Sequence, residues 1–491
     1  MTILRYIFIA FEVVLLFNLL IAVHELGHFL AAKWRGLKIE RFAIWFGKPI
    51  WKKKIGGVEY ALGCIPAGGY VALPQMASME LIEGKPERAE WSDGRGGGTS
   101  RTEMTVEELK ELPPVSPLDK IIVAFAGPLF SFLLAVAFAC IVWGVGKPSN
   151  EGDASTRVGW VDPAGPAWKA GLRPGDTILS VDGYPVKHFA PTAQDSVTWR
   201  IVTSEGTNVA IKYLRDGKEA MAYPVPMHRP TKWYERKDLR HILITPVMKS
   251  IIYSVASNSP AALAGLAKGD EIVALDGKPI YHPWAIISME DSWSNSPVHP
   301  ITLTVKRGDQ EFSRTLTAVK PVQPTNSYPS LGILELGDQS NMTLVYPTPV
   351  EQVRSSVAQV FGTIAALMHR KGEIGVQQLG GAVMIARVYY NLFESEQGWR
   401  LALWFSVIFN VNLALINLLP LPVLDGGHIL LSLIEAAFRR PISARVLQSI
   451  QTGFAALLIV FMLYIAFYDT GDWLRSARGD REPAIVFAPA K

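Results

Sequence analysis

Two histidines and a glutamate near the start of the chain have the spacing of a metal site. The apolar segment 21–30 reads IAVHELGHFL, in which His24, Glu25 and His28 form a His-Glu-x-x-His pattern. In a helix, side chains four residues apart share one face, so both imidazoles would stand together with Glu25 at their edge. Two neutral imidazoles supply half of a tetrahedral zinc site, and a neighbouring carboxylate can accept a proton from water. The pattern therefore predicts hydrolytic metal chemistry.

The apolar surroundings of this pattern strengthen the prediction. The pattern can arise by chance in a chain that contains nine histidines, and a purely structural role is the alternative. Burying ionisable side chains in an apolar helix costs several kcal/mol unless they are partnered. Ionisable groups inside a membrane helix are therefore candidates for function.

The composition indicates a membrane protein with sizeable parts outside the bilayer. Of 491 residues, 49% are hydrophobic and 19% are charged, and the mean hydropathy is +0.20. A chain of this length should form several domains. The formal net charge of +4 is too small to indicate nucleic acid as a partner. Cys64 and Cys140 lie near or in the apolar segments, so we expect no disulfide framework elsewhere.

Four apolar segments are long enough to cross a lipid bilayer, which takes about twenty residues. We expect transmembrane helices at 1–33, 118–146 and 446–469, and a transmembrane helix followed by a Leu-Asp-Gly segment at 399–428. The first segment lacks a convincing small-residue cleavage site, so we expect it to be retained rather than removed as a signal peptide. Residues 470–491 would form an external tail.

Positive charges predict the orientation of these helices. Eight lysines and arginines lie between residues 33 and 54, whereas only Arg5 precedes the first span. The positive-inside rule then places the segment 34–117 in the cytoplasm and the N-terminus outside. The region 146–398 and the C-terminus follow on the outside, and the short loop before the fourth span is basic, as this orientation requires.

The region between the second and third spans contains an internal repeat. The segments 164–183 and 260–277 match at an offset of 94 residues. Each reads as a short helix ended by glycine, a Gly-Asp turn, an apolar strand and an Asp-Gly hairpin turn. They resemble the PDZ domains of bacterial proteases, which implies PDZ domains at 150–230 and 248–320. Such domains bind an extended peptide at a sheet edge, or they serve here only as steric filters; the sequence leaves both open.

Two further segments complete the organisation. Residues 346–393 contain two apolar stretches with interspersed polar side chains, which predicts amphipathic helices along the membrane surface. Helices packed on protein are the alternative. Residues 79–112 are rich in Gly, Glu and Arg, and we expect a flexible cytoplasmic insertion there.

A third metal ligand is expected from a distant part of the chain, because a catalytic zinc commonly has three protein ligands and keeps one position for water. Asp425 fits, since His24 lies about twenty residues into one span that runs inwards and Asp425 lies about twenty-five residues along another, so both reach a similar depth. His428, three residues later, is the rival ligand. A position beside the site or on the surface is the alternative for His428.

Two motifs resemble those of the site-2 protease family of intramembrane zinc metalloproteases. They are His-Glu-x-x-His at 24–28 and Asn-x-x-Pro-x-Pro-x-Leu-Asp-Gly at 417–426. The order of spans and repeats matches the Gram-negative branch of the family with tandem PDZ domains, which acts in the sigma-E envelope stress response. The resemblance implies an α-helical membrane protein with four transmembrane helices, and two α+β PDZ domains inserted between the second and third spans. It implies a bound Zn²⁺ with His24, His28 and Asp425 as ligands, and Glu25 as the general base.

The resemblance also implies an activity. An intramembrane zinc endopeptidase of the bacterial inner membrane would cleave single-span membrane proteins within or near the transmembrane segment. Its substrates would be an anti-sigma factor, already trimmed outside, and remnant signal peptides. The competing hypothesis is a catalytically inactive membrane scaffold whose PDZ pair binds peptide tails. A serine protease is disfavoured because the sequence has no Gly-x-Ser-x-Gly motif.

Residues that bind the substrate are implied in the same way. The run 63–71, GCIPAGGYV, is similar to the family's membrane re-entrant β-hairpin, expected here near 57–73. The implied substrate-binding residues are Gly68, Gly69, Tyr70, Val71, Asn412, Asn417, Pro420 and Pro422. The two prolines would keep the chain extended before Asp425. Without the family, the glycine-rich run reads as a tight turn at the bilayer surface, and the prolines merely end the third span.

One departure from the family concerns the second span. Residues 126–128, Ala-Gly-Pro, match a family motif, but Ser131 stands where the family has asparagine. The departure puts a local polar contact in doubt.

Overall fold

The chain forms two compact units in the computed structural model, and each is described by itself. The first comprises Met1–Lys147, Tyr346–Val360 and Gly380–Phe467, and the second comprises Pro148–Val345, Phe361–Leu379 and Tyr468–Lys491. The structure describes residues 2–76, 115–149, 151–189, 194–324, 327–337, 342–369, 372–395, 397–438, 444–479 and 485–488. The insertion predicted at 79–112 lies outside these residues.

Four helices in the described part of the chain are long and apolar enough to cross a membrane, as the sequence predicts. They are α1 (Thr2–Trp34), α4 (Pro117–Val145), α12 (Gly398–Asn417) and α14 (Ala444–Gly479). α14 continues into the predicted external tail, 470–491, as far as Gly479. No proline interrupts this stretch before Pro483.

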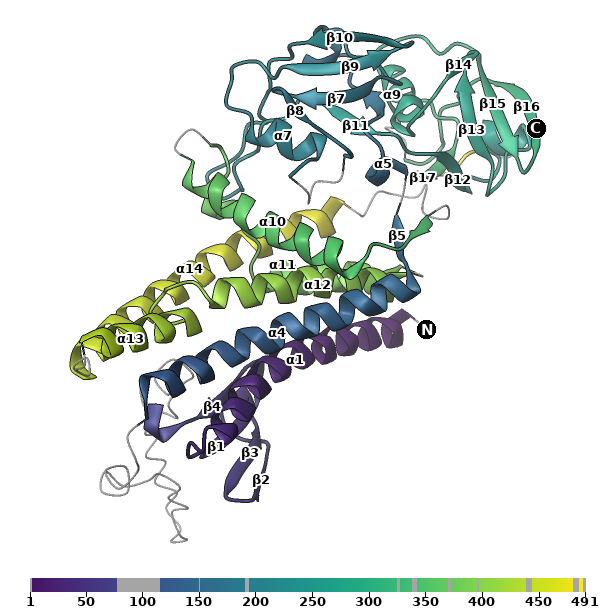
Figure 1. The fold of residues 1–491 in the computed structure, drawn as a ribbon. Coiled ribbons are helices and arrows are strands. Elements are labelled where there is room, and N and C mark those ends of the chain that lie inside the picture. The colour runs from purple at the N-terminus through teal and green to yellow at the C-terminus, as the bar shows by residue number, and fades with distance from the viewer. Residues whose placement is uncertain are drawn as a thin grey trace. The chain divides into compact units, whose positions relative to one another are not determined.

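Helix α4 is central to the first unit, since α1, α12 and α13 (Asp425–Phe438) all pack against it (Figure 1). The contact between α1 and α4 is close because Gly27 has no side chain. A Cβ at Gly27 would lie 2.3 Å from the carbonyl oxygen of Ala126. Small residues at such interfaces let membrane helices approach closely.

The predicted region 399–428, a third span followed by the Leu-Asp-Gly segment, forms two helices in the structure. α12 ends at Asn417, and α13 begins at Asp425. The prolines between them lack an N–H group and interrupt the helical hydrogen bonds. Gly426 then lets α13 start against the end of α12, because a Cβ there would lie 2.3 Å from the Leu418 and Leu419 carbonyl oxygens.

Two amphipathic helices occupy the predicted region 346–393, namely α10 (Pro349–Met368) and α11 (Ala382–Glu394). α11 packs against α12. The Tyr389 side chain of α11 is fully buried, and its hydroxyl lies 2.9 Å from the Ser406 hydroxyl of α12. One side of α11 is therefore covered by protein.

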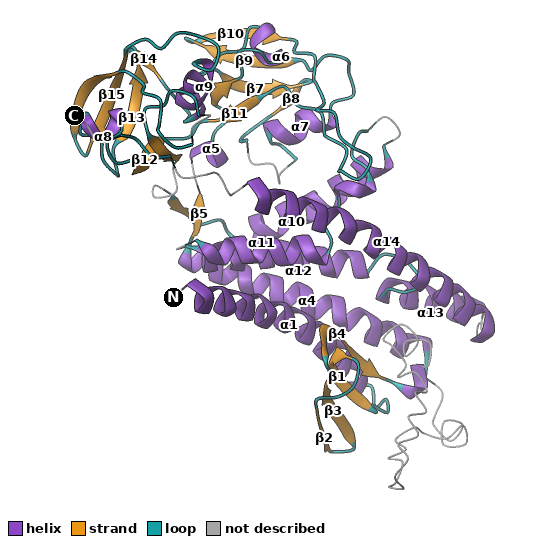
Figure 2. Ribbon diagram, turned by 180° about the vertical axis from the view of Figure 1, so that it is seen from behind, coloured by secondary structure: helices purple, strands orange, loops and turns teal. Residues whose placement is uncertain are grey.

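The structure corrects the strand pairing of the β-hairpin predicted near 57–73. The strands are β1 (Arg41–Phe46), β2 (Trp51–Ile55), β3 (Val58–Leu62) and β4 (Ile65–Ala72), in the order β2-β3-β1-β4 (Figure 2). β1 lies between β3 and β4, so these two strands do not form a hairpin. The hairpin is β2–β3, because Gly56 and Gly57 both have positive φ and form its two-residue turn. A short η1 helix (Pro74–Met76) follows β4.

The second unit contains the repeat as two copies that have the same element order, apart from the additional helix α5 at the start of the first. The first copy consists of α5 (Glu151–Ala154), β6 (Val158–Val161), α6 (Pro166–Lys169), β7 (Thr177–Val181), β8 (Tyr184–Pro185), α7 (Val197–Thr203), β9 (Ile211–Arg215), β10 (Lys218–Ala222) and β11 (Ile244–Pro246). The second consists of β12 (Ser250–Val255), α8 (Pro260–Leu263), β13 (Glu271–Leu275), β14 (Lys278–Pro279), α9 (Trp284–Ser292), β15 (Ile301–Arg307), β16 (Gln310–Leu316) and β17 (Ile333–Gly337). The remaining described elements are β5 (Lys147–Ser149), β18 (Thr343–Val345) and η2 (Val376–Gln378).

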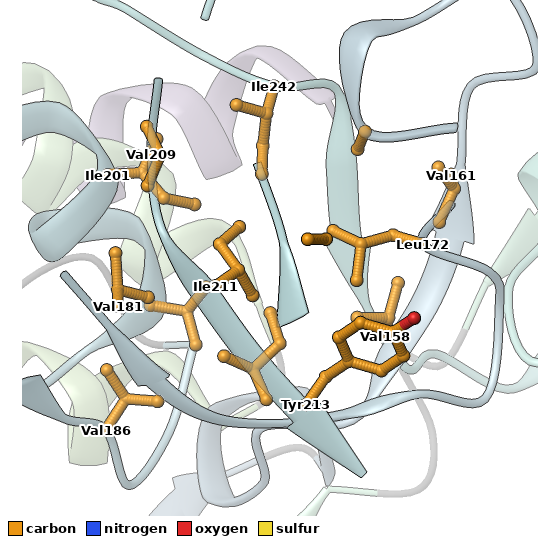
Figure 3. Close-up of a cluster of buried hydrophobic side chains, with 14 of the residues drawn as sticks. Val158, Val161, Leu172, Val181, Val186, Ile201, Val209, Ile211, Tyr213 and Ile242 are labelled. Carbon is orange, nitrogen blue, oxygen red and sulfur yellow. The ribbon is translucent and has the colours of Figure 1, made fainter. Parts of the chain in front are cut away.

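Each copy ends later than the bounds 150–230 and 248–320 suggest. β11 returns to pair with β6, and β17 returns to pair with β12. Figure 3 shows the core of the first copy, where Val158, Leu172, Val181 and Ile211 meet. The closing strand covers one side of this core, since Ile242 just before β11 belongs to the same cluster.

A matching ion pair fastens the Gly-Asp turn of each copy to a strand. The buried Asp176 carboxylate accepts two hydrogen bonds from Arg215, at 2.6 and 2.7 Å. Asp270 accepts two from Arg307, at 2.6 and 2.8 Å. Burial alone would raise the pKa of Asp270, but hydrogen bonds from Arg307 and the Ala267 N–H, together with the charge of Arg307, hold this pKa below its usual value.

We predict that Arg307→Ala weakens the second copy in a pH-dependent way. A carboxyl with a lowered pKa stabilises the folded state above about pH 4 and loses this contribution as the pH falls through its folded value. Hydrogen exchange of β13 and β15, corrected for intrinsic rates, should therefore accelerate several-fold at neutral pH and much less in acid. Arg314→Ala is the control, because Arg314 bonds only carbonyl oxygens. An acceleration that does not change with pH would contradict the role of the ion pair.

Candidate metal centre

The His-Glu-x-x-His segment is helical, as predicted, and its polar side chains are buried. His24, Glu25 and His28 lie on α1 and are 9%, 7% and 2% exposed. The Nε2 atoms of the two imidazoles are 3.3 Å apart. The four-residue spacing thus brings two nitrogen donors to one point.

Asp425, at the first position of α13, completes the cluster. Its Oδ2 atom lies 3.4 Å from His24 Nε2, and its Oδ1 atom lies 3.5 Å from His28 Nε2. Among the described residues, these three form the group whose donor atoms all lie within 4.8 Å of one another. Residues separated by about 400 positions in the chain therefore meet at one place.

Donor type, spacing and available space fit a zinc ion. Zinc–nitrogen distances of about 2.0–2.1 Å in a tetrahedral site correspond to donor–donor separations of about 3.3–3.4 Å, close to those observed here. Gly127 of α4 provides the room. A Cβ at Gly127 would lie 2.2 Å from His28 Nε2 and 2.9 Å from His24 Nε2.

Helix α4 fixes the orientation of both imidazoles. Ser131 Oγ lies 3.0 Å from His24 Nδ1, and His28 Nδ1 lies 2.8 Å from the Val123 carbonyl oxygen. With each Nδ1 engaged by α4, each Nε2 is left facing Asp425. Such partners set ring orientation and tautomer in metal sites.

The role of α4 in orienting the imidazoles was not predicted from the sequence, although Gly127 and Ser131 stood out there. Val123, Gly127 and Ser131 are spaced by four residues and so lie along one face of α4. Ala135 and Ala139 continue this spacing and are fully buried. Small residues repeated every four positions along α4 could have indicated that another helix packs closely against this face.

Glu25 is the remaining carboxylate at the site. Its Oε2 atom is buried and has no hydrogen-bond partner among the described residues. Buried polar atoms are normally partnered, so an unpartnered carboxylate oxygen beside a donor cluster indicates a reactive group.

Strand β4 passes directly beside Glu25. A Cβ at Gly69 would lie 2.9 Å from Glu25 Cγ. Gly68 has φ +69°, and a Cβ there would lie 2.0 Å from the Phe46 ring. Tyr70 stacks on the same ring at 6.1 Å between centroids, and Val71 is buried. The glycines thus let the strand approach both Glu25 and β1.

The other predicted residues lie at the end of α12 and in the connection to α13. Asn412 and Asn417 are half-buried, Pro420 is exposed and Pro422 is half-buried. Within the described part of the chain, no hydrogen bond joins either asparagine to β4 or to the three clustered side chains. His428 is buried on α13 but is not a member of the cluster.

These features define the class of the site: a helix-borne His-His-Asp donor cluster with an adjacent carboxylate, suited to metal-dependent hydrolysis. The family model described as peptidase family M50 matches residues 12–461. The chain therefore belongs to peptidase family M50 and is a zinc metalloprotease.

Several bacterial proteins resemble the chain over nearly their full lengths. The regulator of sigma E protease of Haemophilus influenzae is 27% identical over 93% of this chain and 96% of its own length. The protease RseP of Yersinia pestis is 27% identical over 92% of this chain and 96% of its own. The corresponding regulator of sigma E protease of Salmonella typhimurium LT2 is 26% identical over the same shares.

We predict that Gly127→Ala displaces the imidazoles and weakens zinc binding by about 10–100-fold, as expected where an added methyl group overpacks a core by about 1–3 kcal/mol. Zinc affinity is measured by competition with a chelator. Gly144→Ala is the matched control on the same helix, because a Cβ there meets no described atom within 4 Å. Equal zinc affinity in the two variants would contradict the steric argument.

Proposed function

We propose that the chain is an intramembrane endopeptidase in which His24, His28 and Asp425 hold the catalytic zinc and Glu25 is the general base. The observation that carries this proposal is the convergence of the three donors beside an unpartnered carboxylate, on helices long enough to span a membrane. The match to peptidase family M50 supports the reaction class.

The chemistry divides between the metal and Glu25. A zinc ion at such a site supplies Lewis acidity towards a peptide carbonyl and lowers the pKa of water. Glu25 accepts the proton of the attacking water and passes it to the departing amine. Ser131 and the Val123 carbonyl keep the two imidazoles in the tautomer that presents Nε2 to the metal.

The substrate must be extended when it is cleaved. A transmembrane helix satisfies its own backbone groups and hides its carbonyls, so unwinding exposes groups that lipid cannot satisfy. β4 is the last strand of its sheet, with β1 on one side. We infer that an unwound substrate segment pairs with the other side of β4 and thereby reaches Glu25.

The register of the sheet indicates which groups face this edge. The Ile44 carbonyl of β1 accepts a hydrogen bond from Gly63, away from β4. The direction of the backbone N–H and C=O groups alternates along a strand. Those of Ala43 therefore point to β4, and those of its partner Tyr70 point to β1. Gly69 and Val71 then direct their backbone groups to the free edge. In this proposal Asn412, Asn417 and the segment with Pro420 and Pro422 flank the extended substrate.

The relatives suggest a substrate class and a location. Several of them are named as regulators of sigma E protease. We infer that this chain cleaves a single-span anti-sigma factor after external trimming, and remnant signal peptides, in the bacterial inner membrane. The excess of lysines and arginines after α1 supports an N-terminus, a repeat region and a C-terminus outside, with the site towards the cytoplasm.

We assign the two repeats of the second unit as PDZ domains. The common element order and the strand edges at β11 and β17 support this assignment. Outside the membrane they would keep bulky, untrimmed substrates from the site.

We predict that Glu25→Gln keeps zinc but loses cleavage by at least about 100-fold, the usual contribution of a general base. His24→Ala and Asp425→Ala should lose both zinc and cleavage. Zinc content and cleavage of a single-span test substrate in detergent are measured on the same preparations. Cleavage by Glu25→Gln at the wild-type rate would reject the assigned base, and full zinc in Asp425→Ala would reject the third ligand.

Strand addition predicts a second outcome. Val71→Pro removes an N–H group at the free edge of β4 and should slow cleavage about tenfold or more, with zinc content unchanged. Val71→Ala is the control, because it also removes apolar contacts but keeps the N–H group. If both variants cleave equally fast, β4 does not bind the substrate through this group.

A further inference from the structure

A side-chain carboxylate already occupies the turn that leads into β17. Glu290 of α9 accepts a hydrogen bond from the Leu331 N–H, with 2.7 Å between nitrogen and Oε1. The Ser330 hydroxyl lies 3.4 Å from both carboxylate oxygens of Glu290. The turn therefore binds a carboxylate through one backbone N–H group and one hydroxyl group.

The turn is held in this conformation by its neighbours. Gly332 has φ +79°, and a Cβ there would lie 2.2 Å from Ser259 Cβ. The Gly332 carbonyl accepts a hydrogen bond from Ala256, and the Leu331 carbonyl accepts one from Ala261. These bonds fix the carbonyl groups on one side and leave the Leu331 N–H directed at Glu290.

The turn opens onto a free strand edge. β17 pairs with β12 and is the last strand of its sheet. A peptide that adds antiparallel to β17 can end with its C-terminal carboxylate at this turn, where a backbone N–H group can capture it. The position of the Glu290 carboxylate is therefore the position that a peptide terminus would take.

The first repeat has the same turn, but among the described residues no carboxylate from its helix α7 accepts a hydrogen bond there. The Ile242 and Leu243 carbonyls accept hydrogen bonds from Ala167 and Asp162, just as those of Leu331 and Gly332 do from Ala261 and Ala256. Leu243 has φ +59°, which matches the left-handed Gly332.

The helix residue that corresponds to Glu290 is apolar in the first repeat. We compare the two helices from their C-terminal ends. Ile201 lies two positions before the end of α7 at Thr203, and Glu290 lies two positions before the end of α9 at Ser292. Ile201 belongs to the apolar core and borders a cavity of about 490 Å³, together with Ile242 and Leu243. A side-chain carboxylate at this helix position is thus a feature of the second repeat.

The Glu290 carboxylate is a replaceable occupant. Burial raises its pKa to about 7; the Leu331 N–H and Ser330 oppose this only in part, and the neighbouring Asp291 adds to it. A peptide α-carboxyl has a pKa of about 3.3–3.7 and stays ionised at neutral pH. An ionised terminus is the better acceptor for the same N–H group.

We propose that Glu290 closes the peptide site of the second repeat: its carboxylate holds the Leu331 N–H and the Ser330 hydroxyl beside the free edge of β17, and an extended peptide with a C-terminal carboxylate must displace it to bind. This inference rests on the proposed assignment of the repeat as a PDZ domain. The first repeat is then open to peptides, and the second is closed by its own side chain.

The test compares Glu290→Ala with Asp291→Ala in the purified full-length protein. Asp291 is the neighbouring acidic residue on the same helix and is exposed. The probe is a pool of fluorescein-labelled hexapeptides, with each apolar residue type at the C-terminus, prepared with a free carboxylate or as the C-terminal amide. Binding is followed by fluorescence anisotropy, and hydrogen exchange of residues 331–337 locates it.

We expect Glu290→Ala to bind the free-carboxylate peptides at least about tenfold more tightly than the wild type or Asp291→Ala, with new protection of β17 from exchange. The amide peptides should show no gain. Glu290→Gln keeps the size of the side chain but lacks its charge, and should show a smaller gain in affinity for the free-carboxylate peptides. This variant replaces Glu290→Ala in the test if the alanine variant does not fold. Unchanged affinity in both Glu290 variants, or an equal gain for the amides, would overturn the proposal.

Zinc content and cleavage of a single-span substrate, measured on the same preparations, separate this proposal from the peptidase assignment. Both should stay at wild-type levels in the Glu290 variants, because the metal cluster is in the other unit. A failure of peptide binding with intact cleavage would reject only the closed receptor, whereas a wild type without zinc would reject the proposed site.

Discussion

The close packing of α1 on α4 is the contact on which the metal site depends. Ionisable side chains are costly to bury in an apolar helix, and hydrogen bonds must offset that cost. α4 supplies these partners through the Ser131 hydroxyl and the Val123 carbonyl. The absence of a side chain at Gly127 leaves space for the two imidazoles against the helix backbone. The same packed face that holds two helices together therefore also orients the two imidazoles proposed as metal ligands.

The rest of the first unit brings a third ligand and a strand to this helix pair. The chain ends α12 before two prolines and starts α13 at Asp425, whose carboxylate then faces the imidazoles. On the other side, glycines in β4 allow the strand to pass beside Glu25. A proteolytic site within a membrane needs a base, a metal and a place for an extended substrate, and the residues proposed for these three roles lie around one turn of α1.

Much of this arrangement could be predicted from the sequence because it rests on local signals. The spacing of His24 and His28, the length of the apolar segments and the 94-residue repeat each have a period or motif that reports local structure. The strand order could not be read in the same way. The glycine-rich run at 63–71 suggests a hairpin, but the pairing partner of β4 is β1, which precedes β2 and β3 in the chain. Partner choice depends on tertiary packing, for which a short run of glycines carries no information.

Two further features could not be predicted from the sequence: the role of α4 in orienting the imidazoles and the proposed closure of the second repeat by Glu290. Ser131 differs from the family residue, and only its distance to His24 shows that a polar contact is kept. Glu290 looks like an ordinary acidic residue of a short helix until the Leu331 N–H group is found against it. The closing strands β11 and β17 were missed because each follows a long connection after the recognisable part of the repeat.

The central claim is that His24, His28 and Asp425 together hold one zinc ion. X-ray absorption at the zinc edge of the purified protein tests it most directly, since it reports the type and distance of the atoms bound to the metal. The account predicts about one zinc per chain with imidazole scattering and only nitrogen or oxygen ligands at about 2.0–2.1 Å. A spectrum without imidazole scattering, or with a sulfur shell at about 2.3 Å, would contradict it.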